Sequence, residues 1–223
     1  KIRAYCCVMN DTVLIVAAHL DDFELGMGGT AAKLAVKDKV NLLVLCRGDR
    51  PGTSQVEHIR KTACELNCKE LKIEHTLLGY SDTMLDQTPQ TEICSLIGDV
   101  INNTQPSVVY THHEHDIHKD HQIVSACTKV ACRMRRENSV KSLYEFFIPG
   151  SSDWSFQSNH YNTYHDITPY INIKEKMINR YTTELRQSPD PMCIHMISAR
   201  DIYHGSLCGA DRAEIFNQVF RRC

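Results

Sequence analysis

Short runs of aliphatic and β-branched residues alternate with amphipathic stretches of helical spacing from the start of the chain to about residue 148. This alternation is typical of repeated strand–helix–strand units around a mostly parallel sheet. We expect strands at 12–18, 40–46, 71–78, 107–111 and 142–148, and helices that begin near Gly28, Ser54, Thr91 and Lys119. The pattern therefore predicts an α/β, Rossmann-like three-layer fold.

The chain changes in character after Pro149. Residues 150–166 form a polar stretch that contains aromatic residues, and we expect it to run over one end of the sheet and to wall a substrate site. Helices are expected at 173–185 and near 213–221, with a break at Pro189 and Pro191. We expect one domain over residues 1–223, with a core at 10–150 and a helical and irregular C-terminal extension at 151–223.

Charge and cysteine content restrict the classes of partner and compartment. The chain has 223 residues and a formal net charge of −2, which argues against the basic surface that nucleic acids require. No apolar run is long enough for an integral membrane segment. The eleven cysteines are odd in number and contain no C-x-x-C pair, which favours free thiols in a reducing compartment. We therefore expect a cytoplasmic protein.

Metal-capable side chains follow two of the expected strands. The segment at 17–30 contains His19-Leu20-Asp21-Asp22 directly after the first strand, and residues 111–121 follow the fourth. The carboxyl ends of these strands meet at the edge where open α/β sheets bind ligands. His19, Asp22 and His121 supply the mixed imidazole and carboxylate set that catalytic Zn²⁺ prefers, although iron, cobalt or manganese would also bind it.

The neighbouring residues suit amide hydrolysis. Asp21 is the expected base, because its side chain leaves the backbone in a different direction from that of Asp22. His118 is expected to stabilise the oxyanion and protonate the leaving amine as a cation, with Asp120 fixing its orientation. Asp116 is either an outer partner of the metal ligands or a loop cap.

We expect no metal-binding or nucleotide-binding role for the other histidines and the glycines near these motifs. His112, His113 and His115 are expected to be polar loop residues. The glycines at 26, 28 and 29 do not match G-x-G-x-x-G, so they indicate a tight turn into a helix rather than a dinucleotide site.

The two motifs resemble those of the PIG-L or LmbE-like zinc N-deacetylases. His19-Leu20-Asp21-Asp22 is similar to the family's H-P-D-D, and residues 116–121 are similar to its D-x-H-P-D-H, with Leu20 and Lys119 in the places of proline. The resemblance implies the same roles for the zinc ligands His19, Asp22 and His121, for the base Asp21, and for His118 with Asp120. It further implies a substrate-contacting loop that ends at Asp82, and Arg60 is the nearest match to the family's substrate-binding arginine.

The resemblance extends to residues 209–216 and implies a zinc-dependent hydrolase of linear amide bonds. We expect it to remove the N-acetyl group from an amino sugar that is free, nucleotide-linked or part of a glycan precursor. Residues 144–154 are similar to members thought to act in surface-glycan synthesis, and a homo-oligomer is expected by resemblance. Two alternatives remain, an amidase acting on a thiol–sugar conjugate and a catalytically silent zinc-binding module.

Overall fold

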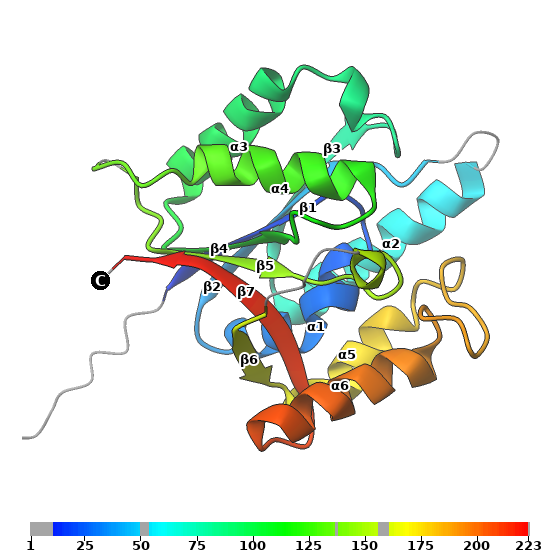
Figure 1. Ribbon diagram of the computed structural model, residues 1–223. Helices are drawn as coiled ribbons and strands as arrows, with labels where there is room; N and C mark the ends of the chain where they lie inside the picture. The colour runs from blue at the N-terminus through cyan, green and yellow to red at the C-terminus, as the bar shows by residue number, and fades with distance from the viewer. Residues whose placement is uncertain (1–10, 50–53, 137, 156–160, 223) are drawn as a thin grey trace, which may run out of the picture.

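A seven-stranded sheet in the order β3-β2-β1-β4-β5-β7-β6 forms the centre of the protein (Figure 1). The computed structural model describes residues 11–49, 54–136, 138–155 and 161–222. Strands β3, β2, β1, β4 and β5 are parallel, whereas β7 runs antiparallel to both β5 and β6. The strands are β1 (Thr12–Ala17), β2 (Lys39–Cys46), β3 (Glu74–Tyr80), β4 (Val108–His112), β5 (Ser142–Phe146), β6 (Thr163–Asp166) and β7 (Ala213–Arg221).

Helices cover both faces of the sheet, which gives three layers (Figure 1). The α-helices are α1 (Asp22–Leu34), α2 (Ser54–Leu71), α3 (Gln90–Thr104), α4 (Lys119–Ala131), α5 (Ile171–Ile178) and α6 (Ile194–Cys208). Short 3-10 helices are η1 (Leu85–Gln87), η2 (Ser152–Trp154) and η3 (Thr168–Tyr170). Helices α3 and α4 lie on one face, and α1, α2, α5 and α6 lie on the other. The predicted α/β fold with a mostly parallel sheet is confirmed.

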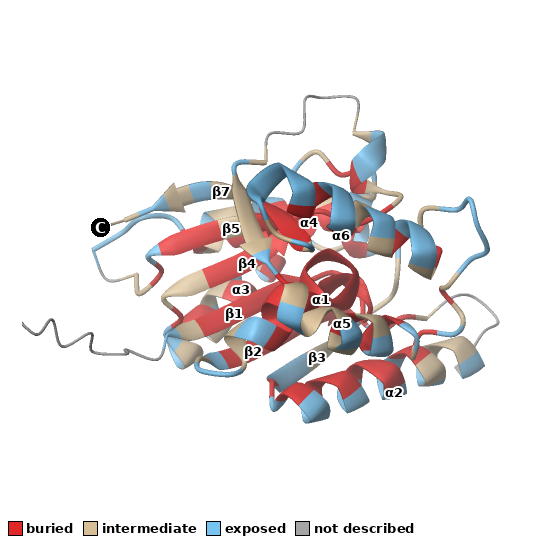
Figure 2. Ribbon diagram, turned by 90° about the horizontal axis from the view of Figure 1, so that it is seen from below, coloured by how far each residue is buried: buried red, intermediate tan, exposed pale blue. Residues whose placement is uncertain are grey.

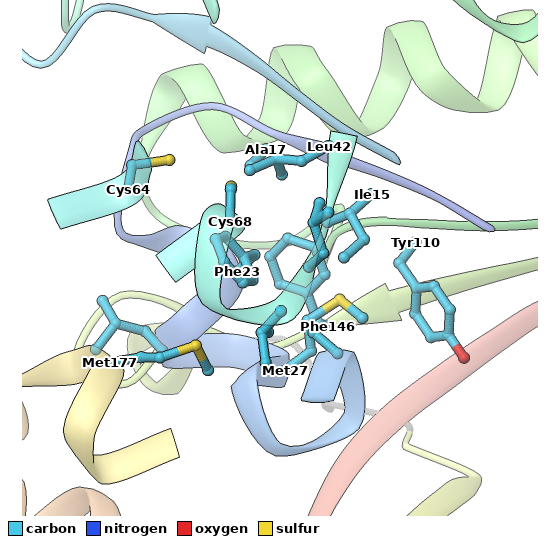
Figure 3. Close-up of a cluster of buried hydrophobic side chains, with 14 of the residues drawn as sticks. Ile15, Ala17, Phe23, Met27, Leu42, Cys64, Cys68, Tyr110, Phe146 and Met177 are labelled. Atoms are coloured by element: carbon cyan, nitrogen blue, oxygen red, sulfur yellow. The ribbon is translucent and has the colours of Figure 1, made fainter. Parts of the chain in front are cut away.

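The central strand β1 explains why the two faces are both apolar. Its residues from Val13 to Ala17 are fully buried, because a parallel strand between helical layers has no face in water (Figure 2). Successive side chains alternate between the two hydrophobic clusters, so that Ile15 packs on the α1 side and Leu14 on the α3 side. Figure 3 shows Ile15 among the side chains of Phe23 and Phe146 on the α1 side.

Helix α1 begins at Asp22, six residues before the predicted start, and the glycines lie inside it. A Cβ atom at Gly29 would lie 2.7 Å from Ile167, so the helix packs too closely there for any side chain. The helix kinks at Met27, whose φ is −152°, and the carboxylate of Glu214 accepts the backbone N–H groups of Gly29 and Thr30. Glu214 thus satisfies amides that the kink removes from the helical ladder.

The C-terminal region differs most from the prediction. Residues 213–221, expected to be helical, form β7, and with β6 they join the sheet, so the extension is not only helical and irregular. Its apolar pairs at 215–216 and 219–220 are four residues apart, a spacing that suits a helix but also keeps side chains on one face of a strand. The helix expected at 173–185 ends at Ile178, and α6 was not predicted.

Within the described part of the chain, no helix is long and apolar enough to cross a membrane. Eight cysteines lie in that part, and all carry free thiols, as predicted. Most of them are buried among apolar side chains, including Cys64 and Cys68 on one face of α2 (Figure 3).

Candidate active site

The two predicted motifs meet at the carboxyl edge of the sheet. Because β1 and β4 are adjacent parallel strands, the residues that follow them converge there. They border a cavity of about 570 Å³. The segment that follows β5 also lines this cavity. Seven of the eight predicted site residues line this cavity, and Asp120 lies behind it. They are His19, Asp21, Asp22, Arg60, Asp82, His118 and His121.

The three predicted metal ligands lie at ligand-to-ligand distances. His19 Nδ1 is 3.1 Å from His121 Nε2 and 3.5 Å from Asp22 Oδ2, and His121 Nε2 is 3.4 Å from Asp22 Oδ1. Tetrahedral Zn²⁺ with bonds of about 2.0–2.1 Å places its ligand atoms about 3.3–3.4 Å apart. The two oxygens of Asp22 face different histidines, so this donor set fits a divalent ion if Asp22 binds it through both carboxylate oxygens.

Each ligand imidazole has a carboxylate behind it. Asp120 Oδ2 lies 3.1 Å from His19 Nε2, and Asp116 Oδ2 lies 3.2 Å from His121 Nδ1. Such outer partners fix the tautomer and orientation of metal-binding histidines. The Asp120 carboxylate was expected to orient His118, but it contacts His19 instead. The sequence left two roles open for Asp116, an outer partner of the metal ligands or a loop cap. Its contact with His121 is that of an outer partner.

The charges around Asp22 favour a cation between the three ligands. Burial opposes ionisation of Asp22, but His121, His112 and His19 hold the pKa of this carboxyl well below its usual value. Burial lowers the pKa of His121, yet Asp22 and Asp116 outweigh it and raise the pKa to about 9. The pKa of His19 is also raised, against its burial, by Asp22 and Asp120. These carboxylates attract a proton to each ring, and a divalent ion competes for the same nitrogen lone pairs.

His118 occupies the N-cap of α4. The sequence analysis expected a cationic ring here, but the contacts of the ring favour the neutral form. Its Nδ1 accepts the backbone N–H of Asp120 at 3.2 Å, which an imidazolium nitrogen cannot do. Burial, together with His121 and His19, lowers the pKa of His118 to about 4. The remaining proton is therefore on Nε2, where the ring acts as a hydrogen-bond donor.

His112 lies beside the metal ligands, although the sequence predicted a polar loop residue at this position. It is the last residue of β4 and fully buried, not a polar loop residue, because the strand extends one residue beyond its predicted end. Its Nε2 lies 2.9 Å from the backbone N of Ala18 and 3.1 Å from Asp22 Oδ2, and its ring stacks on His121. His113 is also buried, whereas His115 remains in the loop.

Arg60 is surrounded by carboxylates on the other side of the cavity. Its side chain is only 4% exposed, and it donates to Asp21 Oδ1 at 3.0 Å and to Asp82 Oδ2 at 2.9 Å. Arg60 Nε lies 3.7 Å from Glu184, a residue of the C-terminal extension that the sequence did not single out. Arg60 thus fixes the position of Asp21, in addition to the substrate-binding role predicted for it.

Comparison with known proteins places these residues in a family. The family profile described as PIG-L, GlcNAc-PI de-N-acetylase, matches residues 14–132, which contain both motifs. A protein of Escherichia coli strain K12, named uncharacterized deacetylase YaiS, is 32% identical over 130 residues. The aligned region covers 54% of this chain and 68% of that protein.

Solved structures share the fold over almost the whole chain. The conserved protein TT1542 from Thermus thermophilus is 24% identical with a TM-score of 0.76, covering 96% of this chain and 97% of that one. The N,N'-diacetylchitobiose deacetylase from Pyrococcus horikoshii is 19% identical with a TM-score of 0.75, covering 94% and 84%. The 4-carboxy-2-hydroxymuconate hydratase GalB from Pseudomonas putida KT2440 is 18% identical with a TM-score of 0.74, covering 96% and 98%. Because a hydratase shares the fold, the fold alone does not define the reaction.

Proposed function

The chain belongs to the PIG-L family of de-N-acetylases, and from this premise we propose that it hydrolyses the N-acetyl group of an amino sugar with the help of a divalent metal ion. The observation that carries the proposal is the spacing of His19, Asp22 and His121. The carboxylate of Asp21 lies beside them and is not one of the proposed metal ligands. A divalent ion, Zn²⁺ in our proposal, supplies a Lewis acid that polarises the amide carbonyl and lowers the pKa of water.

Asp21 is the proposed base. It lines the cavity next to Asp22, and the guanidinium of Arg60 holds its Oδ1 at 3.0 Å. A carboxylate in this position accepts a proton from the water whose oxygen forms the new bond to the carbonyl carbon. The amide C–N bond then breaks, and the nitrogen takes up the proton that Asp21 accepted, so that the products are an amine and acetic acid, which ionises to acetate.

His118 is the proposed donor to the substrate oxygen. With Nδ1 fixed by the backbone of Asp120, its Nε2–H is free to donate a hydrogen bond to the oxygen on which negative charge develops. This role needs a neutral imidazole and resembles the use of histidines at helix N-termini as uncharged electrophiles. Asp120 and Asp116 are proposed to act only through the two ligand histidines behind which they lie.

The experiment is acetate release by the metal-loaded protein from a panel of N-acetyl amino sugars. Asp21→Asn should retain the metal and lose about 100- to 10,000-fold in turnover, the range for removal of a general base. Asp99→Asn, the same change at an exposed position of α3 on the opposite face of the sheet, should leave turnover unchanged. Normal acetate release by Asp21→Asn contradicts its role. A panel without acetate release but with amine release from a thiol–sugar conjugate favours the amidase instead.

A further inference from the structure

The two walls of the cavity beyond the metal ligands have opposite chemical character. One wall carries the carboxylates of Asp49, Asp82 and Glu184 on the side of Arg60, whereas Asp190 lies beside Pro191 and accepts the backbone N–H of Met192. The other wall is apolar and contains Ile148, Pro149, Trp154, Pro191 and Met192. Any substrate that fills the cavity therefore meets hydrogen-bond acceptors on one side and hydrocarbon on the other.

The acidic wall offers no unpaired cation to a phosphate. Arg60 is the one arginine or lysine among the described lining residues, and three carboxylates surround its guanidinium. Arg47 lies just outside and donates to Asp49 at 2.7 Å. Six lining carboxylates, one guanidinium and a divalent ion together carry three net negative charges. Phosphate recognition requires free arginine, lysine or backbone donors, so this wall repels a phosphate group.

The same wall suits the hydroxyl groups of a neutral sugar. A carboxylate only accepts hydrogen bonds, and each sugar hydroxyl can donate one, whereas a fully ionised phosphate has no proton to donate. Hydrogen bonds with a charged partner are shorter and stronger than neutral ones. The amine released by deacetylation would also be a cation near these carboxylates, which is compatible with their charge.

Trp154 gives the apolar wall a flat surface. It lines the cavity although 56% of its surface is exposed, and an indole ring offers a large apolar face on which the C–H face of a sugar ring packs. The 3-10 helix η2, which ends at Trp154, is fixed relative to the metal ligands. Ser151 and Ser152 donate to Asp116 at 2.8 and 2.6 Å, and Asp116 lies against His121.

From these two walls we infer that the substrate is an N-acetyl amino sugar without a phosphate group, and that one of its sugar rings stacks on Trp154. This inference rests on the proposed function and narrows it to free or glycosidically linked sugars. It separates this chain from the phosphate-containing substrate implied by the family description, GlcNAc-PI.

Trp154 is also the single tryptophan of the chain, so its fluorescence reports binding directly. The test uses the metal-loaded full chain with Asp21→Asn, titrated with N-acetylglucosamine, N,N'-diacetylchitobiose and N-acetylglucosamine 1-phosphate. We expect a saturable change in fluorescence with at least one of the two neutral sugars, and a dissociation constant at least about tenfold higher for the phosphate ester than for N-acetylglucosamine. Equal or tighter binding of the phosphate ester overturns the inference.

Variants separate stacking from a general effect on the fold. Trp154→Ala should weaken calorimetrically measured binding of the best neutral sugar at least about fivefold, and Trp154→Phe should restore most of it. Tyr203→Ala, which removes an equally exposed aromatic ring from α6 outside the cavity, should not change binding. Unchanged binding by Trp154→Ala overturns the stacking. If neutral sugars bind as described but the wild type releases no acetate, the proposed function fails, and what remains of the inference is the preference of the cavity for a neutral sugar over a phosphate ester.

Discussion

The inner and outer ends of the cavity are built in different ways. The inner end, defined as His19, Asp22, His118 and His121, comes from two short segments that each follow a parallel strand. The outer end, defined as the carboxylates around Arg60 together with Trp154, gathers residues from four loops and from α2. The residues proposed to carry the reaction therefore come from local motifs on the edge of the sheet. The residues proposed to select the substrate are brought together by contacts between distant parts of the chain.

The largest effect is expected at the inner end. His121→Ala removes a ligand imidazole, and we expect metal affinity to fall by more than about 100-fold, beyond the range for loss of an outer partner. Turnover should fall with it. The measurement is metal stoichiometry after dialysis, compared with His195→Ala, an exposed histidine of α6. Full metal retention by His121→Ala would contradict the assignment of this ligand.

At the outer end, we expect a substitution to lower the stability of the fold rather than the affinity for metal. Arg60→Met leaves the buried carboxylates of Asp21 and Glu184 and the partly buried one of Asp82 without their common partner, and we expect the free energy of unfolding to fall by about 3–5 kcal/mol. Urea unfolding measures this change, and Lys61→Met is the matched control on the exposed side of the same helix. A loss no greater than that of the control would show that these ion pairs do not stabilise the wall.

A smaller effect on metal affinity is expected at Asp116, which contacts both the inner and the outer end of the cavity. Asp116 lies against the ligand His121 and also accepts from the serines that precede Trp154. Asp116→Asn should weaken metal affinity by about 10- to 100-fold through His121. It should also alter the fluorescence of Trp154. A metal titration followed by an emission spectrum tests both; a change in only one of them would show that Asp116 does not connect the ends.

The smallest effect concerns a histidine outside the cavity. Burial among Tyr110, Tyr144 and Phe216 lowers the pKa of His165 to about 4, whereas carboxylates raise that of His121 to about 9. Because the folded state resists protonation of His165, stability is lost as the pH falls from about 6.5 to 4, by about 1–2 kcal/mol at pH 5. Urea unfolding at pH 7.5 and 5 should show a smaller loss in His165→Phe. An equal loss would assign the pH dependence to other groups.

The sequence predicted the inner end because its evidence is local. His19 and Asp22 are three residues apart, and His118 and His121 are likewise three apart, so two strand ends bring four side chains together. Strand β1 was predicted to within one residue, since its buried aliphatic run suits only a central parallel strand.

The outer end could not be predicted in the same way. Glu184 contacts Arg60 only because the chain leaves α5 at Ile178 and returns toward the cavity, and no sequence spacing indicates this. The misassigned strand β7 shows the same limit, because its apolar spacing of four suits a helix and a strand equally well. Pairing with β5, a contact across 70 residues, decides between them.

The most direct test of the metal centre is anomalous X-ray diffraction at the zinc edge, from crystals of the wild-type chain grown with zinc. We predict one ion at the inner end, bound by His19, Asp22 and His121, with Asp21 and His118 outside its coordination sphere. An ion closed by His118 as a further protein ligand would contradict the account and favour the silent zinc-binding module. So would an ion bound instead by His19, Cys46 and Asp120, one of three groups in the described part of the chain whose ligand atoms lie within 4.8 Å of one another.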